Sequence, residues 1–185
     1  NLEPSIVSNP DSVPFPAELQ EGFTFENVGF RYPGTDKWAI RHLSFTLRQG
    51  EKLALVGENG AGKTTLVKLL ARLYDPTEGR ILVDGIDLRN IELYSLRRNI
   101  GIIFQDYIRF QLRAKENIAV GNIDKLAEQL TIEEAAQKSM ADEGIDTLPE
   151  RYEQFLGKRF KDGVDLSGGQ WQKVALGRAY MRDAQ

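Results

Sequence analysis

The sequence predicts an α/β fold in three successive parts: an N-terminal antiparallel β lobe, an α/β core and a helical insert, after which the core must resume. Three observations support this order. Two alternating apolar stretches, at 23–30 and 40–47, precede a glycine-rich loop at 57–64. That loop stands between a strand-sized apolar run and a helical stretch. From about 106 to 165 helical patterns dominate, so this segment is expected to be an insert.

The first 22 residues predict an extended linker. Four prolines, at positions 4, 10, 14 and 16, stand among Ser, Asn and Asp without any sustained periodicity. A chain that opens in this way is expected either to be cut from a longer protein or to have a disordered natural N-terminus.

The loop at 57–64 reads GENGAGKT, which fits the G-x-x-x-x-G-K-[ST] pattern of a phosphate-binding loop. The required order of strand (53–56), turn and helix (65–70) is present, which predicts a P-loop NTPase core. Its glycines let backbone N–H groups point inward at phosphate oxygens, and the helix start adds about half a positive charge. Lys63 is expected to reach the β- and γ-phosphates, and Thr64 to ligate Mg²⁺. The predicted nucleotide-binding residues here are Gly57, Asn59, Gly60, Ala61, Gly62, Lys63, Thr64 and Thr65.

Beyond the loop, the pattern predicts the remaining core and the insert. The loop helix is expected to stop near Asp75-Pro76, because proline cannot continue it. A strand at 80–83 and a short helix at 93–98 lead to 100–104, an apolar run typical of a strand buried in a parallel sheet. Insert helices are expected at 114–119, at 124–130 and from Thr131, in a capping box with Glu134, to about 142.

Composition limits the class of protein. A length of 185 residues suits one domain with a real core, and a net charge of −3 gives no general attraction to nucleic acid or anionic lipid. The absence of cysteine excludes disulfides and thiolate metal sites and fits a reducing compartment. The longest apolar runs are strand-sized, and no signal-peptide pattern opens the chain.

A second motif, LSGGQ at 166–170, opens a helix expected over 171–181. Alone, a Ser-Gly-Gly turn is a common helix cap. Because it stands about a hundred residues after the phosphate-binding loop, the LSGGQ motif resembles the signature of ABC-type ATPases. The whole stretch 23–185 is similar to the nucleotide-binding domain of ABC exporters. Tyr32 resembles the aromatic that stacks on adenine in that family, and Gln105 resembles the glutamine that contacts Mg²⁺ and the attacking water.

The resemblance implies a division of the chain and a set of partners. Residues 1–22 would be the linker from a transmembrane domain and 23–185 the N-terminal portion of an ATP-binding domain, with its insert at 106–165 and signature helix at 166–182. ATP and Mg²⁺ are the implied cofactors, and Gln105 and Lys63 the catalytic candidates. A second nucleotide-binding domain would pair head to tail, as a homo- or heterodimer, at the cytoplasmic face of a membrane, with no nucleic acid partner. The residues acting on the partner's nucleotide would be Ser167, Gly168, Gly169 and Gln170.

In this family an apolar strand ending in Asp-Glu, a D-loop and a switch histidine follow the signature helix, and the printed sequence ends before them. Neither Asp84-Gly85 nor Gln105-Asp106 matches that strand in position, and Asp162 and Asp165 are expected in a solvated loop. Because hydrolysis needs a carboxylate, the chain alone is expected to be hydrolysis-deficient, and its incomplete core poorly stable. Two alternatives stay open: a soluble ABC-type ATPase acting on DNA or ribosomes, and a non-hydrolysing nucleotide-binding module.

Overall fold

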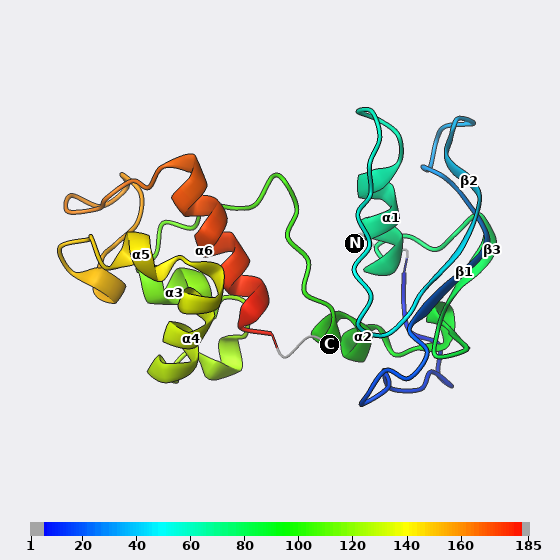
Figure 1. The fold of residues 1–185 in the computed structure, drawn as a ribbon, viewed down its shortest axis with the longest axis horizontal. Coiled ribbons are helices and arrows are strands. Elements are labelled where there is room, and N and C mark those ends of the chain that lie inside the picture. The colour runs from blue at the N-terminus through cyan, green and yellow to red at the C-terminus, as the bar shows by residue number, and fades with distance from the viewer. Residues whose placement is uncertain (1–5, 183–185) are drawn as a thin grey trace. The chain divides into compact units, whose positions relative to one another are not determined.

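The computed structural model describes residues 6–182. These residues divide into two compact units, one up to residue 100 and one from residue 101 on, each with its own buried core (Figure 1). The first five positions of the predicted linker and the last three residues of the chain lie outside the described residues. No helix within 6–182 is long and apolar enough to cross a bilayer.

The first unit is built on a four-stranded antiparallel sheet in the order β2-β1-β3-β4 (Figure 1). The central strand β1 (Phe23–Arg31) pairs with β2 (Trp38–Leu47) on one side and β3 (Glu78–Val83) on the other, and β4 (Ile86–Asp87) pairs with β3. Phe25 lies opposite both Phe45 and Ile81, and the two phenylalanine rings stack 4.3 Å apart. The predicted antiparallel lobe is therefore confirmed, with β3 as a member of the same sheet.

Three helical elements complete this unit: α1 (Lys63–Leu70), the 3₁₀ turn η1 (Leu88–Asn90) and α2 (Leu93–Asn99). Helix α1 ends before Asp75-Pro76, as the sequence predicts. Leu66 and Leu69 of α1 and Leu96 of α2 are buried in one cluster with the apolar face of the sheet. The helix that starts at the phosphate-binding loop is therefore anchored in the core of its unit.

The N-terminal segment belongs to the same core. Val13 forms a parallel bridge with Ile91, and the Phe15 N–H donates to Ser95 Oγ at 2.8 Å. Phe15 and Leu19 are only 6% and 7% exposed. Residues 6–22 contain no helix, and they pack against the rest of the first unit as part of it. The role of residues 1–22 as a linker stays a prediction.

Asp84, at the end of β3, fixes the last part of this segment. Its carboxylate accepts the backbone N–H groups of Gln20, Glu21 and Gly22 at 2.8–3.0 Å. Partial burial of the carboxyl works toward a higher pKa, but the three N–H donors outweigh it, so the pKa of Asp84 lies below its ordinary value. Asp84 thus serves as an N–H acceptor that ties residues 20–22 to the end of β3.

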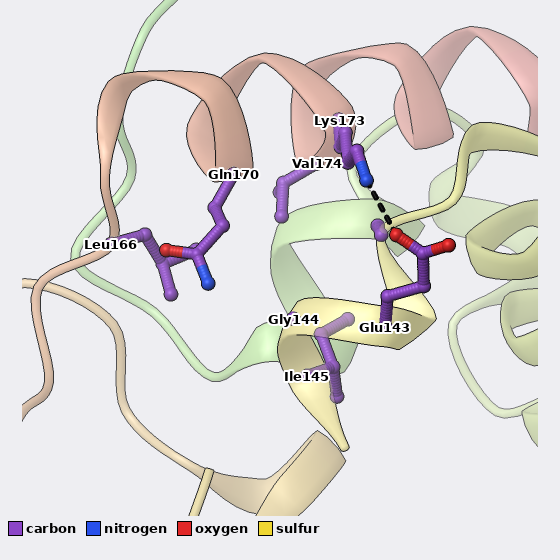
Figure 2. A pocket seen from close by; sticks show the side chains of 8 residues that line it. Glu143, Gly144, Ile145, Leu166, Gln170, Lys173 and Val174 are labelled. Atoms are coloured by element: carbon purple, nitrogen blue, oxygen red, sulfur yellow. Dashed lines mark hydrogen bonds and ion pairs between the residues drawn. The ribbon is translucent and has the colours of Figure 1, made fainter. Parts of the chain in front are cut away.

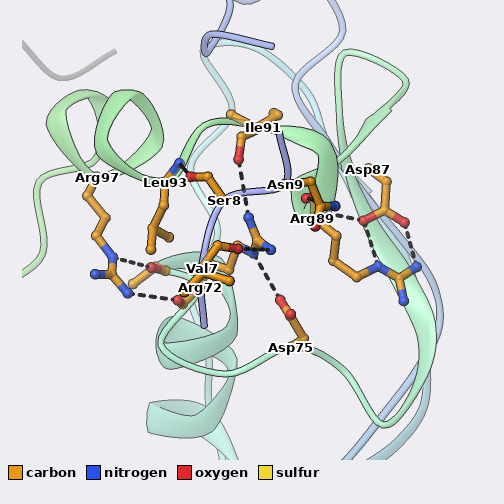
Figure 3. A network of polar contacts seen from close by, with 11 residues as sticks. Val7, Ser8, Asn9, Arg72, Asp75, Asp87, Arg89, Ile91, Leu93 and Arg97 are labelled. Atoms are coloured by element: carbon orange, nitrogen blue, oxygen red, sulfur yellow. Dashed lines mark hydrogen bonds and ion pairs between the residues drawn. The ribbon is translucent and has the colours of Figure 1, made fainter. Parts of the chain in front are cut away.

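Arg72 fixes the first part of the segment (Figure 3). Its side chain, which is almost fully buried, donates to Asp75 Oδ1 at 3.0 Å, to the Ile91 carbonyl at 3.2 Å and to the Val7 carbonyl at 3.4 Å. Ser8 Oγ accepts the Leu93 N–H at 2.8 Å beside it. One guanidinium thus joins the end of α1, the start of α2 and the N-terminal segment.

Two predicted strands are wrong. Residues 53–56 and 100–104 have no sheet partner anywhere in 6–182. Val56 is 95% exposed, and Leu53 and Leu55 are 48% and 41% exposed. A parallel strand has no hairpin neighbour along the chain, so it forms only where other strands flank it. Without such neighbours, Leu53, Leu55 and Val56 line an open groove of about 560 Å³ beside β2 and α1.

The second unit is helical. Its elements are α3 (Ala114–Ala119), η2 (Ile123–Lys125), α4 (Gln129–Ser139), α5 (Asp142–Ile145), η3 (Arg151–Glu153) and α6 (Gly168–Tyr180). Helix α6 packs against α3 and α4, and Trp171 is fully buried at its start. The helical insert is therefore confirmed, and α6 contributes to its core.

The boundaries of two insert helices differ from the prediction. Only a 3₁₀ turn forms at Ile123–Lys125, and α4 then begins at Gln129, so Thr131 lies inside its first turn. The Thr131 hydroxyl donates to Glu128 Oε2 at 2.9 Å, so the predicted capping box with Glu134 is wrong. Glu128 and not Thr131 stands at the N-cap, because the chain already turns into the helix before the threonine.

Candidate nucleotide-binding site

The phosphate loop, residues 57–64, turns directly into α1. Gly60 and Gly62 both have φ of 88°, a left-handed conformation that glycine adopts without strain. A Cβ at Gly62 would lie 2.6 Å from the Ala39 carbonyl oxygen, so a side chain at this position would collide with β2. The turn and the helix lie where the sequence predicts them, although the strand before them does not form.

Lys63 folds back over this loop. Its Nζ donates to the carbonyl oxygens of Gly57 and Glu58, both at 2.7 Å. The first turn of α1 contains no acidic residue, so no carboxylate within the helix offsets its positive end. An ammonium group, a helix N-terminus and two left-handed glycines thus meet in one turn, which fits an anion such as a polyphosphate.

The two threonines after Lys63 differ in environment. Thr64 is exposed in the first turn of α1, whereas Thr65 is 6% exposed and its Oγ1 lies 3.1 Å from the Tyr32 hydroxyl. An exposed hydroxyl next to a phosphate-binding turn fits a Mg²⁺ ligand, since that ion keeps several waters and takes few protein oxygens. Thr65 instead links α1 to the loop after β1.

Tyr32 lies in an aromatic cluster beside α1. Its ring meets Phe30 edge-on at 4.9 Å and Tyr74 edge-on at 5.4 Å. Lys68 Nζ lies 5.4 Å from the ring centroid. Tyr32 therefore packs beside α1, the helix that follows the phosphate loop, and Lys68 of that helix lies over its ring.

Gln105 and the signature belong to the second unit. Gln105 is exposed in a turn directly after 100–104. Two residues further on, the Tyr107 hydroxyl donates to the Gly168 carbonyl at 3.0 Å. The structure thus joins the segment after Gln105 to the signature, while Tyr32 and the phosphate loop lie together in the first unit.

The signature turn, residues 166–170, is closed by a reciprocal capping box. Ser167 Oγ accepts the Gln170 N–H at 3.3 Å, and Gln170 Oε1 accepts the Ser167 N–H at 2.9 Å. Helix α6 therefore begins at Gly168 and not at 171. A Cβ at Gly168 or Gly169 would meet no atom within 4 Å, so the start of this helix faces open space.

Helix α5 supports the signature turn from the side. A small pocket of about 170 Å³ lies between the two helices. Figure 2 shows its lining residues Gln170, Lys173 and Val174 of α6 facing Glu143, Gly144 and Ile145 of α5. Lys173 Nζ donates to Glu143 Oε2 at 2.6 Å. A Cβ at Gly144 would lie 3.2 Å from Gln170 Nε2, so the absence of a side chain there leaves room for the glutamine.

Asp165 has a structural contact that the sequence prediction missed. Its Oδ1 accepts the indole N–H of the buried Trp171 at 3.1 Å, so it is not merely a solvated loop residue. The contacts of Thr65 with Tyr32 and of Gly168 with Tyr107 were also missed. Each joins residues far apart in the chain, and no local pattern in the sequence signals such a pair.

Comparison with known proteins decides the family. The sequence profile described as ABC transporter matches residues 40–185. The chain belongs to the ABC transporter family. The matched range takes in both the phosphate loop and the signature turn, and it identifies an ATP-binding domain.

Similar proteins are transporters. The chain is 41% identical over 160 residues to the subtilin transport ATP-binding protein SpaT of Bacillus subtilis, covering 86% of this chain and 26% of that protein. It is 41% identical over 190 residues to an ATP-dependent lipid A-core flippase of Methylobacillus flagellatus, covering 97% and 31%. A solved bacterial Atm1-family ABC exporter with ATP bound is 35% identical, with a TM-score of 0.86, covering 97% of this chain and 30% of that one. The chain thus spans less than a third of the length of these relatives, and they do not favour the alternative of a soluble ATPase acting on DNA or ribosomes.

Proposed function

We propose that the chain is the ATP-binding domain of an ABC exporter, in which MgATP binding, head-to-tail dimerisation and hydrolysis drive a substrate across a membrane. The observation that carries this proposal is the phosphate loop. Lys63 Nζ lies on the Gly57 and Glu58 carbonyls, Gly60 and Gly62 are left-handed, and α1 begins at once. The relatives named above support the exporter class.

In the ATP-bound state, the N–H groups of the loop and the positive end of α1 would hold the phosphate oxygens. Lys63 would leave its two carbonyl acceptors and donate to the β- and γ-phosphates instead. Tyr32 would provide a flat apolar face to adenine, held in place by the Thr65 hydroxyl. Each contact adds to ground-state binding, and Lys63 also stabilises the charge that moves during phosphoryl transfer.

Mg²⁺ would be held by Thr64 and Gln105 together with phosphate oxygens and water, and it would neutralise charge on the phosphates during transfer. Gln105 would orient the attacking water. Thr64 is exposed at the helix start and Gln105 in its turn, as a water-rich site requires. The hydrolytic step belongs to the complete, paired protein, where a carboxylate orients or deprotonates the water.

The second anion site is the start of α6. Ser167, Gly168, Gly169 and Gln170 are proposed to act on the γ-phosphate bound by a partner domain, either identical or different. The open space around both glycines supports this, because a phosphate could approach the backbone closely. Partners would be a second nucleotide-binding domain and a transmembrane domain, at the cytoplasmic face of a membrane and without nucleic acid.

Lys63→Ala in the full-length protein tests the phosphate loop. The alanine cannot make the two charge-assisted contacts that Lys63 is proposed to donate to the β- and γ-phosphates. Because such contacts contribute about 1.5–3 kcal/mol each, ATP binding is expected to weaken at least about a hundredfold. Isothermal calorimetry measures this affinity. The control is Lys52→Ala, an exposed lysine just before the apolar run at 53–56, which should leave the affinity unchanged. An unaltered ATP affinity in Lys63→Ala would overturn the assignment of the loop.

A further inference from the structure

The segment after Gln105 and the signature turn are joined through side chains that the sequence motifs do not include. The Tyr107 hydroxyl donates to the Gly168 carbonyl at 3.0 Å, and its ring packs against the core of the second unit. Gly168 is the first residue of α6. A single phenol thus contacts the helix turn that carries the signature's N–H groups.

A second set of contacts makes this segment rigid further along. Arg178 of α6 donates to the Ile108 carbonyl at 2.6 Å and to both the carbonyl and Oδ1 of Asn117 at 2.9 Å. Its guanidinium also lies 4.8 Å from the centre of the Phe110 ring. Residues 107–110 are therefore held against α6 at both ends of the helix.

Asn117 completes the arrangement. It is fully buried, and its Nδ2 lies 3.1 Å from the carbonyl oxygens of Phe110, Leu112 and Arg113. Because buried amide groups with every partner in place are costly to rearrange, residues 108–113 form one stiff piece with α3 and α6. Tyr107, two residues after Gln105, precedes this stiff piece directly, and its hydroxyl contacts the signature turn at Gly168.

We propose that Tyr107 is a positioning residue: its hydroxyl, donating to the Gly168 carbonyl, holds the first turn of α6 in the orientation in which the N–H groups of the signature turn can meet a partner's phosphate. The effect on ATP turnover rests on the proposed function above. The anchor itself is a property of the second unit alone. Tyr107 touches neither nucleotide nor metal in this scheme, and its hydroxyl acts only through Gly168.

Tyr107→Phe removes the hydroxyl and keeps the packed ring. Tyr180→Phe is the matched control, because Tyr180 ends the same helix and is 45% exposed. In the full chain without nucleotide, amide exchange at Gln170 and Trp171 is expected to become about fivefold faster in Tyr107→Phe, which corresponds to one neutral hydrogen bond. Exchange at those two amides that matches wild type would overturn the anchor.

The second arm uses the complete transporter. Tyr107→Phe is expected to lower kcat for ATP about fivefold while the equilibrium affinity of the full chain for ATP stays at the wild-type value, because the signature acts after binding. A kcat equal to wild type, or an equal loss of affinity and kcat, would overturn the positioning role. If the wild-type transporter shows no ATP turnover, the proposed function fails, and the exchange arm still decides whether Tyr107 anchors the turn.

Discussion

Replacing Arg72 with methionine tests whether one buried guanidinium attaches the N-terminal segment to the rest of its unit. Methionine fills most of the volume of the arginine stem but donates no hydrogen bond. Arg72 has φ of 47°, in the left-handed region, and methionine would be strained there to a similar degree, so the backbone contribution cancels in the comparison. The change therefore isolates the three donated bonds drawn in Figure 3.

The expected cost follows from what remains after the change. Asp75 is 31% exposed at its side chain and can be rehydrated, so the loss of its ion pair is partly offset. The carbonyl of Ile91, a residue with no exposed surface, would be left without its side-chain partner, at a cost of about 1–3 kcal/mol. Removing a buried charge returns some desolvation energy. The net loss of local stability is therefore about 2 kcal/mol.

Native-state amide exchange measures this loss within one unit, which a global unfolding curve of a two-unit chain does not. The Val13 N–H donates to Asn90, and the Glu92 N–H donates to Val13, so both report on the docked segment. A loss of 2 kcal/mol corresponds to exchange about thirtyfold faster. Arg48→Met, at an exposed surface ion pair, serves as the control. Exchange at Val13 and Glu92 within about threefold of that control would refute the reasoning.

Two pH-dependent predictions follow from perturbed carboxyl and phenol groups. Because the pKa of folded Asp84 is below 3.8, Asp84→Asn should lower the free energy of unfolding by about 1 kcal/mol at neutral pH. The difference should vanish as pH falls through the folded pKa, as amide exchange at Gly22, compared between the two proteins at several pH values, would show. An equal difference at pH 2 would contradict it. Burial and the nearby Glu133 raise the pKa of Tyr152 to about 12. The difference in absorbance between wild type and Tyr152→Phe should therefore show almost no phenolate at pH 10. The stability that neutral Tyr152 provides should be lost as pH rises from 10 to 12. Phenolate absorbance of Tyr152 at pH 10 would contradict the burial argument.

Local signals in the sequence predicted the two turns that begin α1 and α6. Gly62 and Ser167 act within a few residues of their own positions, through a left-handed φ and a reciprocal hydrogen bond. Such signals need no distant partner, and a pattern of spacing therefore captures them. The roles of these residues toward nucleotide stay predictions, since they depend on a ligand and a second domain.

Non-local structure was harder to predict. The run at 53–56 has the composition of a buried parallel strand, yet a strand exists only with neighbours, and no strand within 6–182 flanks it. The burial of Phe15 and Leu19 could not be predicted for the opposite reason. They are isolated apolar residues in a proline-bearing segment, so no period marks them, and only the cluster formed by distant elements shows that they are buried.

The two cores give this chain a built-in pair of optical reporters. Its sequence has two tryptophans, and one falls in each unit: Trp38 in β2 and Trp171 in α6. Trp38 is partly exposed, with Arg31 and Arg41 over its ring at 4.6 Å and 4.8 Å, whereas Trp171 is fully buried with its indole N–H on Asp165. The emission of Trp171 is therefore expected to lie to the blue of the emission of Trp38. Fluorescence can thus report on the first and the second unit separately, without any added label.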